Sequence, residues 1–350
     1  MAISPAPSAI PPRLRKALMI GLVAVVFLWT VWPWLPMERN RHPKTIVLYG
    51  FSILERVIVK EIFPAFQKRW MAQTGQAVEL LGAFAGSGTV TNQLIMGVPA
   101  EMAILSTELD ADRLQQAGVI PPGSWKALPH RGVINRTPFV ILVRPGNPKM
   151  IHDFADLAKP GVRIIHSDPL TSGGANWAIV AKFGSAMRRP GAAPDAGRNL
   201  LTGIWRNVFA QAGSARAART QFDNGFGDAL ITYEQDALGS RGPGSAGFEI
   251  IYPQSTILSE HTLVVAPAKI SKENIVMIRE FRDFLWSEEA QRLFVKNGFR
   301  SVDERLNAAN PQFGHIRDPF SIDDFGGWQQ AKRHIIDGIW KERVLKELKL

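Results

Sequence analysis

The amino-acid sequence predicts an α/β fold of two lobes, each a mostly parallel sheet flanked by helices. From residue 45 onward, short apolar runs of β type alternate with longer segments of helical period, the pattern of a parallel sheet covered on both faces. A strand closed by a Gly/Pro turn, residues 137–148, separates a first set of these units from a second. An apolar run at residues 17–36, ahead of both sets, adds an N-terminal transmembrane helix to the prediction.

Residues 17–36 are predicted to be an uncleaved signal anchor. Three basic residues come before an uncharged run about as long as a bilayer-crossing helix, and three tryptophans cluster at its far end. No A-x-A-like cleavage site follows. We therefore expect residues 1–16 in the cytoplasm and the chain beyond Lys44 on the periplasmic or extracytoplasmic face of the membrane. The alternative is a signal that is cleaved at an unusual site.

The first lobe is predicted over residues 45–136. Strands are expected at 45–50, 78–84 and 101–106, with a helix at 53–70 between the first two. A Gly/Ser loop after the second strand opens a short helix. Thr107 is a plausible N-cap for the helix that follows the third strand, and Gly118 is its stop.

The second lobe is predicted over residues 137–233, and later segments complete the first. Strands are expected at 137–148, 162–167 and 227–233, with helices from Gly173 and over 199–212. Further strands at 248–253 and 262–267 and a helix pair at 271–298 lie in the region of about 234–300, which we assign to the first lobe. Residues 301–350 form a C-terminal segment that ends in a basic amphipathic helix from Gln329.

Composition excludes several classes of protein. The 350 residues are 46% hydrophobic and 21% charged, which suits about two domains. About half of the net charge of +10 lies before residue 45, and no run of basic residues alternates with aromatic ones, so nucleic acid is not a predicted partner. Because the chain has no cysteine, disulfides and thiolate chemistry are unavailable.

Two loops of the same design carry the functional prediction. Gly86, Ser87 and Gly88 lie between a predicted strand and a helix of the first lobe, and Ser172, Gly173 and Gly174 do so in the second. The first amides of a helix have no partner within it, and glycine removes the Cβ atoms that would keep an anion away. If the lobes face each other, the two loops can enclose one small oxyanion.

Enzymatic sites find little support. The G-x-S-x-G pattern of a nucleophilic serine is absent around Ser87 and Ser172, and no Lys-Ser/Thr completes a phosphate-binding loop. The seven histidines show no metal-binding spacing, and His166 is expected to be a satisfied loop residue. Asp110 and Asp112 are interpreted as the solvated face of a helix. We therefore predict no catalytic residue, no metal and no cofactor.

Several segments together resemble a known family. "GSG" from Gly86, "FVILVRPGNPKMIHDFADLAKPGV" from Phe139, "TSGGANW" from Thr171, "GDALITYEQDA" from Gly227 and "FGGW" from Phe325 appear in the order seen in sulfate- and thiosulfate-binding proteins of bacterial ABC transporters. The resemblance extends from Thr45 to about Trp328. It implies the type II periplasmic binding protein fold and a monomeric, hinged receptor that delivers a tetrahedral dianion to a permease and its ATPase.

The resemblance also implies a set of ligand contacts. The family's contact positions fall on Ser52, Ser87, Ser172, Gly173, Gly174, Ala215 and Tyr233 here. With Gly88 of the first Gly/Ser loop, they make eight predicted ligand contacts. Ser52 stands where an aspartate is usual, and Tyr233 stands where a tryptophan is usual. Arg216 is expected to brace its loop rather than bind the ligand.

Selectivity stays open at this point. A pocket of donors alone suits fully ionised sulfate, because hydrogen phosphate must also donate a proton. The two altered positions leave molybdate and phosphate as alternative ligands. A sensory module that has kept the fold without transport is the alternative function.

Overall fold

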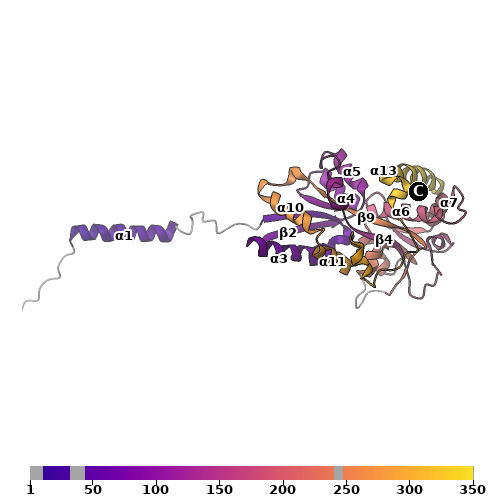
Figure 1. Cartoon of the computed structure of the whole chain (residues 1–350), viewed down its shortest axis with the longest axis horizontal. Coiled ribbons are helices and arrows are strands. Elements are labelled where there is room, and N and C mark those ends of the chain that lie inside the picture. The colour runs from indigo at the N-terminus through magenta and orange to yellow at the C-terminus, as the bar shows by residue number, and fades with distance from the viewer. Residues whose placement is uncertain (1–10, 32–43, 240–246, 350) are drawn as a thin grey trace, which may run out of the picture. The chain divides into compact units, whose positions relative to one another are not determined.

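Figure 1 shows the computed structural model of the chain, in which residues 11–31, 44–239 and 247–349 are described. The chain divides into two units, Met1–Lys44 and Thr45–Leu350. In the first unit, residues 12–31 form helix α1 (Pro12–Val31).

The transmembrane helix predicted over residues 17–36 is not supported. Across the described ranges, no helix combines the length and the apolar character that crossing a membrane requires. Helix α1 begins with a basic segment, and its apolar residues run from residue 17 to residue 31, where the described range 11–31 ends. The remainder of the predicted span, 32–36, lies outside the described residues.

The first strands of the second unit confirm the sequence-based prediction. They are β1 (Lys44–Phe51), β2 (Val78–Ala85) and β3 (Met102–Leu105). The helical stretch after β1 consists of α2 (Glu55–Val57), the π-helix η3 (Ile58–Ile62) and α3 (Phe63–Thr74). Pro64 has no N–H to donate to the preceding turn, and the wider π-turn occurs there. Two further helices follow β2 and β3, namely α4 (Ser87–Ile95) and α5 (Glu108–Gln116).

The next part of the chain supplies a second group of strands: β4 (Val133–Val143), β5 (Ile164–Ser167), β6 (Val208–Ala212) and β7 (Ala229–Tyr233). Helices α6 (Gly173–Met187), α7 (Ala196–Arg206) and α8 (Ala215–Asp223) lie between them.

The helix predicted over 199–212 is wrong in its second half. Helix α7 ends at Arg206, and 208–212 is strand β6, which pairs in parallel with β5. The Asn207 side chain donates to the carbonyls of Leu157 and Lys159 at 2.7 and 2.8 Å, which holds the chain where the helix stops. Side chains then alternate in exposure along β6.

The described strands form one mixed sheet. Its main order is β2-β1-β3-β9-β4-β7-β5-β6, with β9 spanning Ser255–Val265; β8 (Glu249–Ile251) pairs with β4, and β10 (Asp318–Phe320) pairs with β9. Strand β4 pairs with β9 over residues 133–138 and with β7 over 139–143, antiparallel in both cases. The parallel pairs β1/β3 and β5/β7 lie on either side. Strands β4 and β9 thus join the two halves of the sheet.

The C-terminal elements pack against both halves. Helices α10 (Ile275–Phe284) and α11 (Glu288–Lys296) confirm the predicted helix pair. Phe281 of α10 meets Phe66 of α3 edge to face in the first half, with 4.9 Å between ring centroids. The predicted terminal helix is formed by α13 (Gly327–Ala331) and the π-helix η10 (Lys332–Leu345). The buried ring of Trp340 meets that of Trp205 on α7 edge to face, with 5.2 Å between ring centroids. This contact fixes the terminal helix on the body of the protein.

Candidate functional site

The eight residues predicted to contact an anion lie where strands end and helices begin. Ser52 follows β1, Ser87 and Gly88 open α4 after β2, Ser172 to Gly174 open α6 after β5, Ala215 opens α8 after β6, and Tyr233 ends β7. In open α/β sheets this edge is where ligands bind. The sequence places each residue at an element boundary; the contacts among these boundaries come from the tertiary structure.

The two Gly/Ser loops contact each other directly. The Gly88 amide donates to the carbonyl of Thr171 at 3.0 Å. A Cβ on Gly86 would lie 2.3 Å from that same carbonyl oxygen and 2.5 Å from the carbonyl of Gly213. A Cβ on Gly173 would lie 3.2 Å from the Cβ of Ser87. The loops therefore meet in a closed arrangement, and one amide predicted to face an anion is occupied by a protein carbonyl.

The Ser87 hydroxyl is engaged on the protein side. It donates to Asp110 Oδ2 at 2.6 Å and accepts from the Ser106 amide at 2.9 Å. Thr107 donates to the same carboxylate oxygen at 3.1 Å, and Arg113 lies 3.4 Å from the other one. With its proton directed to Asp110, Ser87 presents an oxygen that can accept a further hydrogen bond.

Asp110 corrects a prediction. It was expected on the solvated face of a helix, but its residue is only 5% exposed and sits under Ser87. Burial raises the pKa of the Asp110 carboxyl, against the lowering effect of the Ser87 hydrogen bond and the Arg113 charge. In the sequence, the hydroxyl of Thr107, three residues earlier, was the signal from which an inward-facing Asp110 could have been predicted.

Tyr233 lies under the second loop. Its hydroxyl is 2.7 Å from the Ser106 hydroxyl, and a Cβ on Gly174 would lie 2.7 Å from the Tyr233 oxygen. Burial raises the pKa of the Tyr233 phenol well above its usual value, so the side chain stays neutral. The indole N–H of Trp177 donates to the Ser106 carbonyl at 2.6 Å. Ser106, which the sequence did not single out, thus connects Ser87, Tyr233 and α6.

Ser52 connects β1 to the start of α8. The Arg216 amide donates to the Ser52 hydroxyl at 3.4 Å, and Ser214 caps α8 by accepting from the Ala217 amide at 3.1 Å. The Arg216 guanidinium lies 3.6 Å from the buried carboxylate of Asp236. This ion pair supports the predicted bracing role of Arg216. Ala215 is the first residue of α8, so its amide has no acceptor within the helix.

His166 was expected to lie in a loop. It lies instead on β5, where it forms a buried pair with Lys182 of α6. Its Nδ1 is 2.6 Å from the Ser167 carbonyl, and its Nε2 is 2.7 Å from Lys182 Nζ. The Ser167 carbonyl can only accept, so Nδ1 carries the proton and Nε2 accepts from the amine. Burial lowers the pKa values of both His166 and Lys182 well below their usual ranges.

Metal binding finds no support in the part of the chain that the structure describes, where no three His, Asp or Glu side chains group together as a metal site would require. The predicted site is surrounded by the first turns of helices α4, α6 and α8, by serine hydroxyls and by a neutral phenol. This arrangement offers partial positive charge from backbone dipoles rather than from a cation.

Comparisons with known proteins agree with the resemblance drawn from the motifs. A family model described as bacterial extracellular solute-binding protein matches residues 56–300. A sulfate-binding protein of Synechococcus elongatus is 32% identical over 310 residues, covering 87% of each chain. A thiosulfate-binding protein of Pseudomonas aeruginosa is 30% identical over 289 residues, covering 81% of this chain and 87% of the relative.

A solved structure supports the same assignment. The sulfate-binding protein SubI from Mycobacterium tuberculosis superposes with a TM-score of 0.75 at 29% identity, over 83% of this chain and 98% of that one. The α/β fold described above is therefore the two-lobed fold of periplasmic binding proteins. The chain belongs to the family of bacterial extracellular solute-binding proteins.

Proposed function

We propose that this protein is an extracytoplasmic receptor, not an enzyme, that binds sulfate or thiosulfate and delivers it to an ABC permease and its ATPase. The observation that carries the proposal is the meeting of the loops before α4, α6 and α8 at one edge of the sheet. Amides at helix starts bind anions without a cation, and each charge-assisted hydrogen bond contributes about 1.5–3 kcal/mol. The names of the relatives supply the ligand class.

The proposed contacts are the eight residues named from the sequence. Ser52, Ser87 and Ser172 supply hydroxyls, Gly88, Gly173, Gly174 and Ala215 supply amides, and Tyr233 supplies a phenol. To donate to sulfate, the Ser87 hydroxyl must turn its proton away from Asp110. For an anion to enter, the hydrogen bond from Gly88 to the Thr171 carbonyl must open, because it occupies an amide of the proposed site. We infer that the lobes separate at strands β4 and β9 and close again around the anion.

Calorimetric titration of the full-length protein with sulfate, thiosulfate, molybdate and phosphate tests the proposal. We expect micromolar or tighter binding of sulfate or thiosulfate. Ala215→Pro deletes one proposed donor at the first position of α8, where proline is tolerated and the preceding Ser214 is already extended. We expect it to weaken the anion about tenfold or more.

Glu288→Pro is the matched control. Glu288 is the first residue of α11, also after an extended serine cap, and belongs to no proposed contact. We expect this variant to bind sulfate as the unmodified protein does. Absence of binding for all four anions would refute the proposed function. Equal binding by Ala215→Pro would remove Ala215 from the site.

One observation favours a second ligand class, an oxyanion that still carries a proton. Because Ser87 directs its own proton to Asp110, its oxygen is free to accept from a ligand O–H group. Hydrogen phosphate would satisfy this acceptor, whereas fully ionised sulfate would not. Tighter binding of phosphate than of sulfate in the same titration would select this alternative.

We also propose, from the sequence alone, that the apolar residues 17–36 attach the protein to the membrane. Extraction of cell membranes with high salt and then with detergent measures this. An anchored protein appears only in the detergent fraction and keeps its gene-encoded N-terminus. Release by salt, or a mature N-terminus near Met37, would contradict the attachment.

A further inference from the structure

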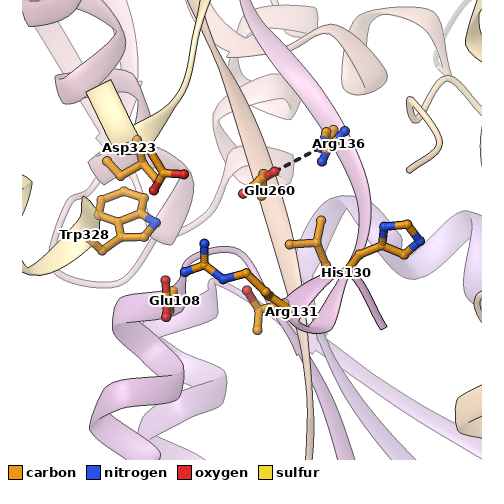
Figure 2. Close-up of a pocket in the computed structure, with 10 residues that line it drawn as sticks. Glu108, His130, Arg131, Arg136, Glu260, Asp323 and Trp328 are labelled. Carbon is orange, nitrogen blue, oxygen red and sulfur yellow. Dashed lines mark hydrogen bonds and ion pairs between the residues drawn. The ribbon is translucent and has the colours of Figure 1, made fainter. Parts of the chain in front are cut away.

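A cavity outside the proposed anion site lies between α5, strands β4 and β9, and the C-terminal segment. Its volume is about 310 Å³, which is roughly the volume that ten water molecules occupy in the liquid. Figure 2 shows its polar lining residues Glu108, His130, Arg131, Arg136, Glu260 and Asp323 around an open space, with Trp328 on one side. None of the lining residues belongs to the eight proposed anion contacts.

Most of the charge around this cavity is already paired. Arg136 Nε lies 3.0 Å from Glu260 Oε1, as the dashed line in Figure 2 marks. Glu108 Oε1 lies 2.8 Å from Lys126 Nζ and accepts from the indole N–H of Trp125 at 3.3 Å. Arg136 Nη1 also lies 3.3 Å from Glu304 Oε1, so these charged groups are already engaged with one another.

Arg131 and Asp323 remain as an unpaired cation and an unpaired anion. Among the described residues, neither the Arg131 guanidinium nor the Asp323 carboxylate takes part in a hydrogen bond or an ion pair. In Figure 2 the Arg131 side chain extends between Glu108 and Trp328, and Asp323 lies beside the same indole. Both residues are exposed, so water solvates their charges, and they border one cavity without pairing with each other.

The backbone that carries Arg131 is held in an uncommon conformation. His130 (φ 50°, ψ 33°) and Arg131 (φ 57°, ψ 34°) both adopt left-handed geometry, and Gly132 follows at φ 82°. For residues other than glycine this conformation is strained, and it persists where the surroundings fix it, often at binding sites. Here it directs Arg131 into the cavity just before β4 begins.

Trp328 supplies a fixed apolar wall. It is buried, and its ring meets that of Trp177 edge to face at 4.3 Å between centroids. Its indole N–H makes no hydrogen bond with any described residue. Because Trp328 is only 3% exposed, it offers the cavity a narrow apolar surface next to one positive and one negative group. The side chain of a small ligand can contact this surface while the charged groups hold its ends.

We propose that this cavity binds a small zwitterion, a free α-amino acid, with its carboxylate on Arg131 and its ammonium group on Asp323. A simple anion would contact only Arg131, and a simple cation would contact only Asp323. A ligand carrying both charges satisfies both groups and adds no net charge. The side chain of the amino acid lies against Trp328.

A thermal-shift screen of the full-length protein tests this proposal. Each of the common amino acids is added at about 10 mM, which saturates a site of millimolar affinity, and positives are titrated by calorimetry. We expect at least one amino acid to raise Tm. We expect its decarboxylated amine and its deaminated acid to bind at least about tenfold more weakly, because each loses one charge-assisted contact.

Two variants locate the binding. Arg131→Gly removes the guanidinium at a left-handed position that glycine tolerates, so the fold is retained. Asp323→Asn removes the exposed carboxylate. Each is expected to weaken the amino acid about tenfold or more. Arg279→Gln and Glu280→Gln, at exposed positions of α10, are the matched controls and should bind unchanged.

The proposal fails if no amino acid binds, or if Arg131→Gly and Asp323→Asn bind as tightly as the unmodified protein. It also fails if sulfate displaces the amino acid competitively while both variants bind it normally, because the amino acid would then occupy the anion site. Binding of sulfate itself is measured separately, so failure of this proposal leaves the proposed receptor function intact.

Discussion

At the scale of single residues, the glycines of the proposed site are needed for packing within the protein as well as for access to an anion. A Cβ on Gly173 would lie 2.8 Å from the Cβ of Ser106, and a Cβ on Gly174 would lie 2.7 Å from the Tyr233 oxygen. Contacts under about 3 Å require a shift of one partner. The pair of glycines therefore lets α6 begin directly against Ser106 and Tyr233.

We predict that Gly174→Ala destabilises the protein by about 1–3 kcal/mol, because Tyr233 must move to make room. We also expect it to weaken sulfate at least tenfold, since the displaced phenol is a proposed contact. Urea unfolding and calorimetry measure the two effects. Gly213→Ala is the control: it lies near the same loops, and its nearest neighbour would be 3.8 Å away. Equal effects of the two variants would contradict this account.

The buried pair of His166 and Lys182 predicts a pH dependence of stability. The Lys182 amine is enclosed, with its Nζ 4.4 Å from the centre of the Trp205 ring, and its pKa is lowered by burial. In the unfolded chain the same amine binds a proton below about pH 10.4. The unfolded state thus binds more protons than the folded state, and stability rises with pH in this range.

We expect the free energy of unfolding to rise by at most about 1.4 kcal/mol per pH unit from this residue between pH 8 and 10. Lys182→Met should remove that slope, although it leaves His166 Nε2 without its donor. Lys272→Met, at an exposed position, should keep the slope. Urea unfolding at several pH values checks this, and an unchanged slope in Lys182→Met would show that Lys182 is protonated in the folded state.

At the scale of elements, helices α8 and α11 are equally long and each begins with a serine cap, but they lie in different parts of the structure. Ser214 accepts from the Ala217 amide at 3.1 Å at the start of α8, and Ser287 accepts from the Ala290 amide at 3.3 Å at the start of α11. Both helices contain nine residues. Of these two helices, only α8 starts at the proposed anion site.

We predict that Ser214→Ala and Ser287→Ala each destabilise the protein by about 1 kcal/mol, as loss of a cap usually does. Only Ser214→Ala should weaken sulfate, because the start of α8 would lose the fixed position of the Ala215 amide. Thermal unfolding and calorimetry separate the two effects. Equal sulfate affinity in both variants would mean that α8 takes no part in binding.

At the scale of the whole molecule, closure depends on how near the two loops can approach. Gly86 has φ −60° and ψ 140°, which any residue can adopt, so its role is to leave space. A side chain there would meet the carbonyls of Thr171 and Gly213 from the other half of the sheet. A side chain at residue 86 would therefore affect only how closely the two halves of the sheet approach each other.

We predict that Gly86→Ala folds normally but cannot close fully. Small-angle X-ray scattering should show a larger radius of gyration than that of the unmodified protein when both are at saturating sulfate, and sulfate should bind more weakly. The Gly213→Ala variant should compact as the unmodified protein does. A compact Gly86→Ala variant with full affinity would refute the closing role of this contact.

The sequence by itself determined the α/β class, most element positions and the family, because apolar period and Gly/Ser turns are local properties of the chain. It misplaced the end of α7 because the segment 199–212 mixes apolar and polar residues in a way that fits helix and strand alike. The stop at Asn207 depends on the carbonyls of Leu157 and Lys159, which are about fifty residues away in the chain.

Only the tertiary structure decided what the predicted site residues contact. Asp110 under Ser87, Ser106 against Tyr233, and the Thr171 carbonyl on the Gly88 amide join segments that are far apart in the sequence. The same holds for the cavity beside Arg131, whose walls come from four separate parts of the chain. Local sequence specifies which groups a loop carries, whereas the register of the sheet and the packing of helices on it decide which groups meet.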